Sequence, residues 1–303
     1  MGVKRLLLAG LAVALCSGAV LTSASAPPPR TVRSECPQQW GGREPGGWVP
    51  AAAKFDGVDE FLVPGIPVAA TICAYPGDNT RPGRERLAGS RVLVGGAGAM
   101  ARDLAYLPIS DRSGLCTLMG GPMTNYLIRF DYPGGFALWV GTAEEVNACV
   151  VTTNGTAGSR SYVGRSITAA YRTGAWKLIR PEDPCQGDGG RRGQGEHMVP
   201  GEPASVVVCR SASGTKPAAM REHGAAEARS LAAALNAQDS WPTDHGCQGG
   251  SGLSYRLMFR YADGPPASVH LIVGCDPPIG NPLLQGDLDD VAYRHVLRLA
   301  PPE

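Results

Sequence analysis

The sequence predicts an α+β protein made of two tandem homologous domains. Each domain is expected to be an antiparallel sheet whose long hairpin packs on one or two helices and which two disulfides hold together. Eight of the nine cysteines fall into two sets of four. Residues 62–73 align without a gap on residues 198–209, and residues 125–135 align equally well on residues 254–264. Apolar and polar residues alternate along this second pair, as in half-buried strands.

The length of 303 residues agrees with two domains. We expect a signal peptide over residues 1–26, a leader over 27–35, a first four-cysteine repeat over 36–176, a proline-stiffened linker over 177–184 and a second four-cysteine repeat over 185–303. Each repeat is long enough to bury a core of its own, so the disulfides support a core rather than replace it.

The first residues predict export. Lys4 and Arg5 precede an apolar stretch over residues 6–21, and small residues follow at Ala24 and Ala26. This is the pattern of a secretory signal peptide, and the apolar stretch is too short for a membrane-spanning helix. Cleavage after Ala24 and cleavage after Ala26 both fit the pattern.

The ninth cysteine, Cys16, leaves two fates open. Residues 13–18 resemble the lipobox of bacterial lipoproteins, whose cysteine becomes lipid-modified, although Leu15 stands where that motif has a small residue. Otherwise Cys16 is removed with the signal peptide. In both cases we expect a secreted, extracellular chain, where paired cysteines persist. Contact with a membrane is expected only if Cys16 carries a lipid.

Each repeat shows the same order of elements. A Pro-Gly turn leads into a short apolar strand that ends at Cys73 or at Cys209. A helix is expected next, because residues 225–235 place Ala and Leu on one face, and residues 101–104 share an Ala-Arg-x-Leu pattern with them. A closing helix is expected over residues 289–299, where acidic residues begin the segment and basic residues end it.

The hairpins carry the clearest periodicity. Alternate residues over 255–261 are apolar, and so are alternate residues over 269–273. Placing both apolar sets on one face needs an odd-numbered loop, such as residues 263–265, since a one-residue slip would flip every side chain. The matching loop of the first repeat is residues 133–135. Each sheet is therefore expected to pack one face on helix and to expose the other face to solvent.

Four cysteines in a repeat allow three pairings, and sequence alone does not choose among them. The open end of each hairpin brings two cysteines together, and the remaining two then pair with each other. This geometry favours the pairs Cys36–Cys73, Cys116–Cys149, Cys185–Cys209 and Cys247–Cys275. Each loop closed in this way would add roughly 3 to 4 kcal/mol of stability.

Neither the composition nor the motifs of the chain predict catalysis or a cofactor or metal site. The net charge of +1 and the shortness of the basic clusters argue against partners such as nucleic acid or a membrane surface. The chain has no motif typical of a nucleophile, a dinucleotide site or a phosphate loop. All five histidines fall in the second repeat, without the spacing of metal ligands. We therefore predict a non-catalytic protein with no cofactor and no metal site.

One pair of sheet faces is a candidate for binding. With the loop chosen above, Arg129 and Trp139 lie opposite each other on the outer face of the first sheet. The matching face of the second sheet carries Arg256, Arg260 and His270. Our hypothesis is that these faces contact an extracellular protein or a cell-wall component, because an exposed tryptophan beside an arginine is an unusual use of apolar surface. The alternative is a cross-strand pair that the leader or the other repeat covers.

Both repeats have a Pro-Gly turn before the first strand. The second repeat has three further motifs: Cys209-Arg210, Leu-Ala-Ala-Ala-Leu-Asn over residues 231–236 and Phe-Arg-Tyr-Ala-Asp-Gly over residues 259–264. With these features the chain resembles a widespread secreted bacterial domain of unknown function. The resemblance covers both repeats and implies no activity.

The succession of strand, helix and hairpin, with its cysteines, is also similar to the bacterial subtilisin-inhibitor family. In that family the reactive loop follows the third cysteine. The resemblance therefore implies a reactive loop at Thr117, Leu118 and Met119 in the first repeat, or at residues 248–250 in the second. The chain departs from the family in having no cysteine at the start of the helix. We predict a secreted, non-catalytic binding protein, with a serine-protease inhibitor as the alternative and an extracytoplasmic enzyme with an unrecognised site as the third reading.

Overall fold

The structure is a computed structural model, and it describes residues 36–109, 119–180, 182–185, 190–211, 219–244, 246–249 and 252–302. These residues belong to one compact unit, Ser34–Glu303. The expected signal peptide and leader, together with Cys116, Thr117 and Leu118, lie outside the described residues. Among the helices that the structure describes, none combines the length and the apolar character that a membrane span requires.

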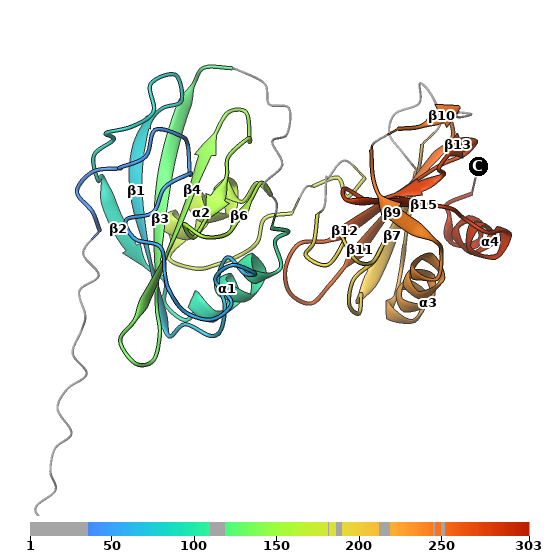
Figure 1. Cartoon of the computed structure of the whole chain (residues 1–303), viewed down its shortest axis with the longest axis horizontal. Coiled ribbons are helices and arrows are strands. Elements are labelled where there is room, and N and C mark those ends of the chain that lie inside the picture. Colours follow the sequence, from blue (N-terminus) through green and yellow to red (C-terminus); the bar gives the residue numbers. More distant parts are fainter. Residues whose placement is uncertain are drawn as a thin grey trace, which may run out of the picture. The chain divides into compact units, whose positions relative to one another are not determined.

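Within the described part of the chain, six antiparallel strands form the first sheet, in the order β2-β1-β3-β4-β5-β6 (Figure 1). The strands are β1 (Ala69–Asp78), β2 (Gly89–Val92), β3 (Pro122–Asp131), β4 (Ala137–Glu145), β5 (Thr152–Thr153) and β6 (Gly158–Ser159). Helices α1 (Ala97–Ala105) and α2 (Gly164–Thr173) pack on one face, where Met100, Leu104 and Ile167 are fully buried. This layer of sheet and helix is the main core of the first half.

The first hairpin has the predicted register. Arg129 lies opposite Trp139 and Ile128 lies opposite Val140, so the turn falls on residues 133–135 as expected. Ile128 and Val140 are completely buried against the helices. The alternation in the sequence therefore identified correctly which side chains of β3 and β4 face the core.

The opposite face of the first sheet is covered, and the expectation that it meets solvent is wrong. Trp40, which is 1% exposed, packs there with Tyr75 and Leu127, and the ring of Trp48 lies 5.2 Å from the ring of Trp40. The hydroxyl of Tyr75 donates to the carbonyl of Pro37 at 2.8 Å. The segment that precedes β1 therefore builds a second, smaller core on this face.

As far as the chain is described, the second sheet has seven antiparallel strands in the order β8-β7-β11-β12-β14-β15-β9 (Figure 1). The strands are β7 (Ser205–Ser211), β8 (Ala219–His223), β9 (Ser240–Pro242), β11 (Ser254–Arg260), β12 (Ala267–Ile272), β14 (Ile279–Gly280) and β15 (Leu284–Gly286). Strands β10 (Gln248–Gly249) and β13 (Cys275–Asp276) pair separately.

The two helices expected in the second half are confirmed. Helix α3 (Ala225–Asn236) buries Leu231 and Leu235 in the core of this sheet. Helix α4 (Asp290–Leu299) begins after Asp289, whose carboxylate accepts a hydrogen bond from the N–H of Ala292 at 2.7 Å. The acidic residue caps the helix because it satisfies a backbone donor that has no partner within the helix.

The second hairpin keeps the predicted faces but shifts its register by two residues. Loop 263–265 would place Leu257 opposite Leu271, whereas Leu257 lies opposite Val269. A shift of two residues leaves every side chain on its face, since the period of a strand is two. Leu257, Val269 and Leu271 are all buried in the same core, as expected.

The disulfides follow the predicted pairing wherever the structure describes both cysteines. The described bonds, with their Cα–Cα distances, are Cys36–Cys73 (5.9 Å), Cys185–Cys209 (5.8 Å) and Cys247–Cys275 (5.4 Å). Cys149 is also disulfide-bonded. Its predicted partner, Cys116, lies outside the described residues.

Candidate functional site

The predicted binding residues of the first sheet have partners inside the chain. The guanidinium of Arg129 lies 5.8 Å from the ring centroid of Trp139, and its Nε lies 2.9 Å from the carboxylate of Asp131. Trp139 is half-buried and packs against the cluster around Trp40. The described covering is the cluster around Trp40, whereas the alternative expected the leader, which lies outside the described residues, or the other repeat. Binding at this face stays a prediction that rests on the exposed part of Trp139.

The predicted residues of the second sheet are brought together in a similar way. Arg256 lies opposite His270 on the neighbouring strand. The Nη1 of Arg260 donates to the carboxylate of Glu222 at 2.8 Å. All three predicted side chains are only partly exposed. The three side chains lie on one face of the sheet. All three are polar, so they do not form the exposed apolar patch that would mark a contact surface.

Met119 is the predicted loop residue that the structure presents most clearly. Met119 is 57% exposed and lies outside any helix or strand. Its N–H donates to Oδ1 of Asn147 at 3.0 Å, and its carbonyl accepts from Nδ2 of Asn147 at 3.0 Å and from Nδ2 of Asn79 at 2.9 Å. Both backbone polar groups of an exposed apolar residue are therefore held by side chains from distant parts of the chain.

Asn79 extends the same network to Gly121. Its Oδ1 accepts from the N–H of Gly121 at 2.8 Å, and its own N–H donates to the carbonyl of Gly121 at 3.1 Å. Asn79 follows β1 and Asn147 follows β4, so two strand ends of the first sheet hold the segment that leads into β3. The backbone of residues 119–121 is thus fixed to the turns that directly follow β1 and β4.

Glu145 orients both asparagines. Its Oε2 accepts from Nδ2 of Asn79 at 3.1 Å and from Nδ2 of Asn147 at 2.9 Å. The same oxygen accepts the N–H of Asn147 at 2.8 Å, and Oε1 accepts the N–H of Cys149 at 2.7 Å. Burial alone would raise the pKa of this carboxyl, but these donors outweigh burial and hold its pKa below its ordinary value of 4.5. Glu145 is therefore ionised at neutral pH.

We call this arrangement the Met119 platform: exposed Met119 and the backbone of Gly121, held by Asn79, Asn147 and Glu145. The sequence reasoning named Met119 but missed the three residues that hold it. One signal could have found Asn147, which stands two positions before Cys149. A disulfide from Cys149 to Cys116 would bring Asn147 close to the residues after Cys116. Nothing comparable marks Asn79.

The other loop that the sequence predicted, residues 248–250, has a different backbone arrangement. Residues Gln248–Gly249 form strand β10, which pairs with β13 beside the Cys247–Cys275 disulfide. Gly250 lies outside the described residues. The backbone of this segment is thus engaged in strand pairing, and the platform geometry is described for the first half alone.

The described residues hold no group of three or more His, Cys, Asp or Glu side chains placed to bind a metal ion. The fold and the site together define a disulfide-bonded α+β protein with large antiparallel sheets and an exposed, hydrogen-bonded Met119 platform. Comparison of the chain with models of known protein families, with curated proteins and with solved structures gives no match.

Proposed function

We propose that the protein is a secreted, non-catalytic binding protein that contacts an extracellular protein partner through the Met119 platform. The observation that carries the proposal is the fixed backbone of an exposed apolar residue. A contact residue that is already held in place loses less conformational entropy when it binds. Methionine suits such a role because its flexible, polarisable side chain adapts to different apolar pockets. The described disulfides support the extracellular location.

We also propose that the two halves of the chain are homologous repeats whose functions have diverged. Both halves bury a tyrosine that donates to a proline carbonyl at 2.7 Å, Tyr132 to Pro64 in the first and Tyr261 to Pro200 in the second. The aligned cysteines and hairpins support the same proposal. Under it, the platform is specific to the first repeat, whereas the second repeat uses the equivalent segment in β10.

A photo-crosslinking experiment tests the binding function. A photoreactive amino acid would replace Met119 in one variant and Met220 in another, and each mature protein would be irradiated in the culture medium of the producing organism. Met220 is a matched control because it is 60% exposed, similar to Met119, but lies on the edge strand β8. We expect a discrete protein adduct from position 119 and none from position 220. No adduct, or the same adducts from both positions, would contradict the proposal.

The second candidate function is inhibition of a serine protease, with Met119 as the residue that enters the specificity pocket. The same hydrogen bonds favour it, because a protease substrate must shift its backbone during attack and a clamped backbone resists that shift. Cys149, two residues from the clamping Asn147, is disulfide-bonded and adds a covalent constraint close to the platform. The similarity to the subtilisin-inhibitor family implies the same position for the reactive residue.

A protease panel tests this candidate. We expect inhibition of a subtilisin-like or a trypsin-like protease with a dissociation constant on the order of nanomolar, as is usual for such complexes. Replacing Met119 by Asp should weaken inhibition by about a hundredfold, the effect of removing a central contact residue. Replacing Met220 by Asp should leave it unchanged. The absence of inhibition across the panel would remove this candidate and leave the binding function standing.

A further inference from the structure

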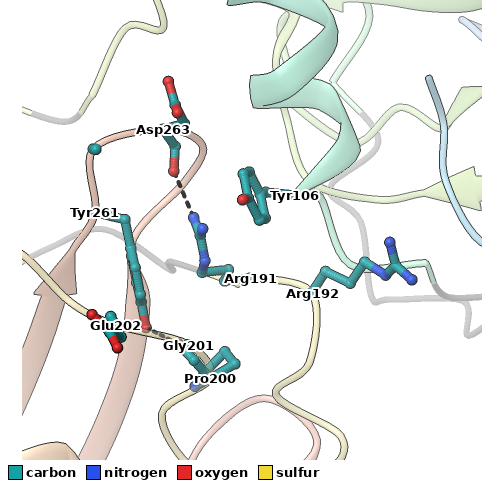
Figure 2. Close-up of a pocket in the computed structure, with 9 residues that line it drawn as sticks. Tyr106, Arg191, Arg192, Pro200, Gly201, Glu202, Tyr261 and Asp263 are labelled. Atoms are coloured by element: carbon teal, nitrogen blue, oxygen red, sulfur yellow. Dashed lines mark hydrogen bonds between the residues drawn. The ribbon is translucent and has the colours of Figure 1, made fainter. Parts of the chain in front are cut away.

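The buried guanidinium of Arg191 is the feature that the proposed function leaves unexplained. Arg191 is 6% exposed, and its Cζ lies 3.8 Å from the ring centroid of Tyr106 and 3.8 Å from that of Tyr261. Figure 2 shows the guanidinium between the two rings. Both faces of the cation are therefore covered by aromatic rings, which attract it and hold its plane in one orientation.

The guanidinium of Arg191 makes its described hydrogen bonds through a single nitrogen, Nη1. Its Nη1 donates to the carbonyl of Asp263 at 2.8 Å (Figure 2) and to the carbonyl of Pro265 at 3.0 Å. Among the described residues, no atom accepts from Nε or Nη2. Arg191 lines a cavity, and the edge between these two nitrogens carries no described bond. That edge offers two parallel N–H donors, the arrangement that a carboxylate accepts best.

Among the residues that the structure describes, no carboxylate contacts the guanidinium of Arg191 directly. The carboxylate of Asp263 pairs with Nε of Arg102 at 3.4 Å. The carboxylate of Asp103 accepts from the N–H of Gly264 and from Nε1 of Trp176, both at 2.6 Å. The direct acceptors of Arg191 are thus neutral carbonyls. Burial lowers the pKa of Arg191, and the nearby tyrosines and aspartates offset that effect only in part.

The open edge belongs to a cavity of about 330 Å³ whose wall includes Tyr106, Tyr261, Pro200 and Ala262. This volume lies at the small end of the range typical of ligand sites. Glu202 and Asp263 line the same cavity. Their negative charges repel any anion, so a carboxylate binds only where the contact with Arg191 outweighs them, and a ligand with a second anionic group is disfavoured further. Arg192 lines the cavity as well, but its Nη2 pairs with the carboxylate of Glu60 at 3.4 Å. The walls thus combine the guanidinium edge of Arg191 with a paired arginine, two carboxylates and aromatic surface.

We propose that the Nε–Nη2 edge of Arg191 binds the carboxylate of a small monocarboxylate ligand, which the rings of Tyr106 and Tyr261 flank. A peptide carboxyl terminus and a sugar acid both offer this group, and the experiment below separates them. The site shares no residue with the Met119 platform. The proposal therefore stands whether or not the function proposed for that platform is correct.

The test is a titration of the full mature, disulfide-bonded protein, followed by the NMR signal of the Arg191 Nε–H group. N-acetylalanine supplies a peptide-like carboxylate, its primary amide is the matched neutral control, and glucuronate is a sugar acid. We expect a saturable shift with N-acetylalanine and none with the amide. Saturation by glucuronate alone would assign the site to sugar acids. No saturable shift with either acid, or equal affinity for the amide, would overturn the proposal.

Two kinds of variant complete the test. Arg191→Lys keeps the charge but removes the pair of parallel donors, so the affinity for the carboxylate should fall by about tenfold or more, as measured by calorimetry. Because this change also disturbs the stacking on the tyrosines, a second variant leaves Arg191 intact. Ala262→Glu places a competing carboxylate in the cavity wall and should abolish binding, whereas Ala262→Gln should stay within about twofold of the native affinity. Equal binding by the Glu and Gln variants would refute the site.

Discussion

Replacement of Asn154 or of Asn281 by alanine is expected to lower the free energy of unfolding by about 3 to 5 kcal/mol, because each change leaves several buried backbone groups without a partner. Asn154 is completely buried. Its Nδ2 donates to the carbonyls of Val58, Phe61 and Leu62 at 2.8, 2.9 and 3.3 Å, and its Oδ1 accepts from the N–H groups of Thr156 and Ala157 at 2.8 and 2.7 Å.

Asn281 has the same role in the second half. Its Nδ2 donates to the carbonyls of Gln194, His197 and Met198, and its Oδ1 accepts from the N–H groups of Leu283 and Leu284. One asparagine in each half thus ties a turn to the segment that leads into the first strand. A comparable loss in both variants is expected if the halves are homologous repeats.

Urea denaturation at neutral pH measures the effect, with Asn236→Ala as the matched control. Asn236 makes a similar pair of hydrogen bonds to the backbone of Val199, at 2.9 and 2.8 Å, but its side chain is exposed. Val199 is itself buried, but removing an exposed side chain lets water into the space beside its backbone, so we expect a loss of no more than about 1 kcal/mol. If Asn154→Ala and Asn236→Ala lost the same stability, burial of the unpaired groups would not be the cause.

The sequence predicted the structure correctly where side chains repeat with the two-residue period of a strand, because that period places alternate residues on one face. Alternation in the hairpins identified the core side chains Ile128, Val140, Leu257 and Val269, and the cysteine pattern led to the described disulfides. A period of two fixes only the parity of a register, which is why the face was right in the second hairpin while the register was two residues off.

The covered face of the first sheet could not be predicted in the same way. Trp40 and Trp48 come from an irregular segment with no periodicity, and they pack on the sheet in one cluster with the Cys36–Cys73 bond. Asn79 and Arg191 likewise lie in loops. Their partners are far apart in the sequence, and a loop residue shows no pattern that would reveal a contact across tens of positions. The sites could therefore be found only in the tertiary structure, whereas the sheet and helix layers that carry them could be predicted from the sequence.

The Met119 platform is expected to depend on the ionised carboxylate of Glu145, and Glu145→Gln should weaken it at neutral pH. Glutamine keeps the shape of the side chain but loses the charge and points an amide donor at other donors. Hydrogen bonds to a charged acceptor contribute about 1.5 to 3 kcal/mol each to stability. We expect a total loss of about 2 to 4 kcal/mol, concentrated in the platform. Glu202→Gln, at an exposed position, is the control and should change stability by less than about 0.5 kcal/mol.

The pH dependence follows from the direction of the pKa shift. The pKa of Glu145 in the folded protein lies below the ordinary value of 4.5 that applies to the unfolded chain. Its stabilising contribution is therefore fully present above that value and is lost as the pH falls through the folded pKa. Hydrogen exchange of the Met119 and Gly121 amides, corrected for the intrinsic pH dependence of exchange, measures this locally. Protection in the native protein should fall on acidification below about pH 4.5, whereas the glutamine variant should show weak protection at every pH. An identical pH profile in both proteins would show that Glu145 does not hold the platform.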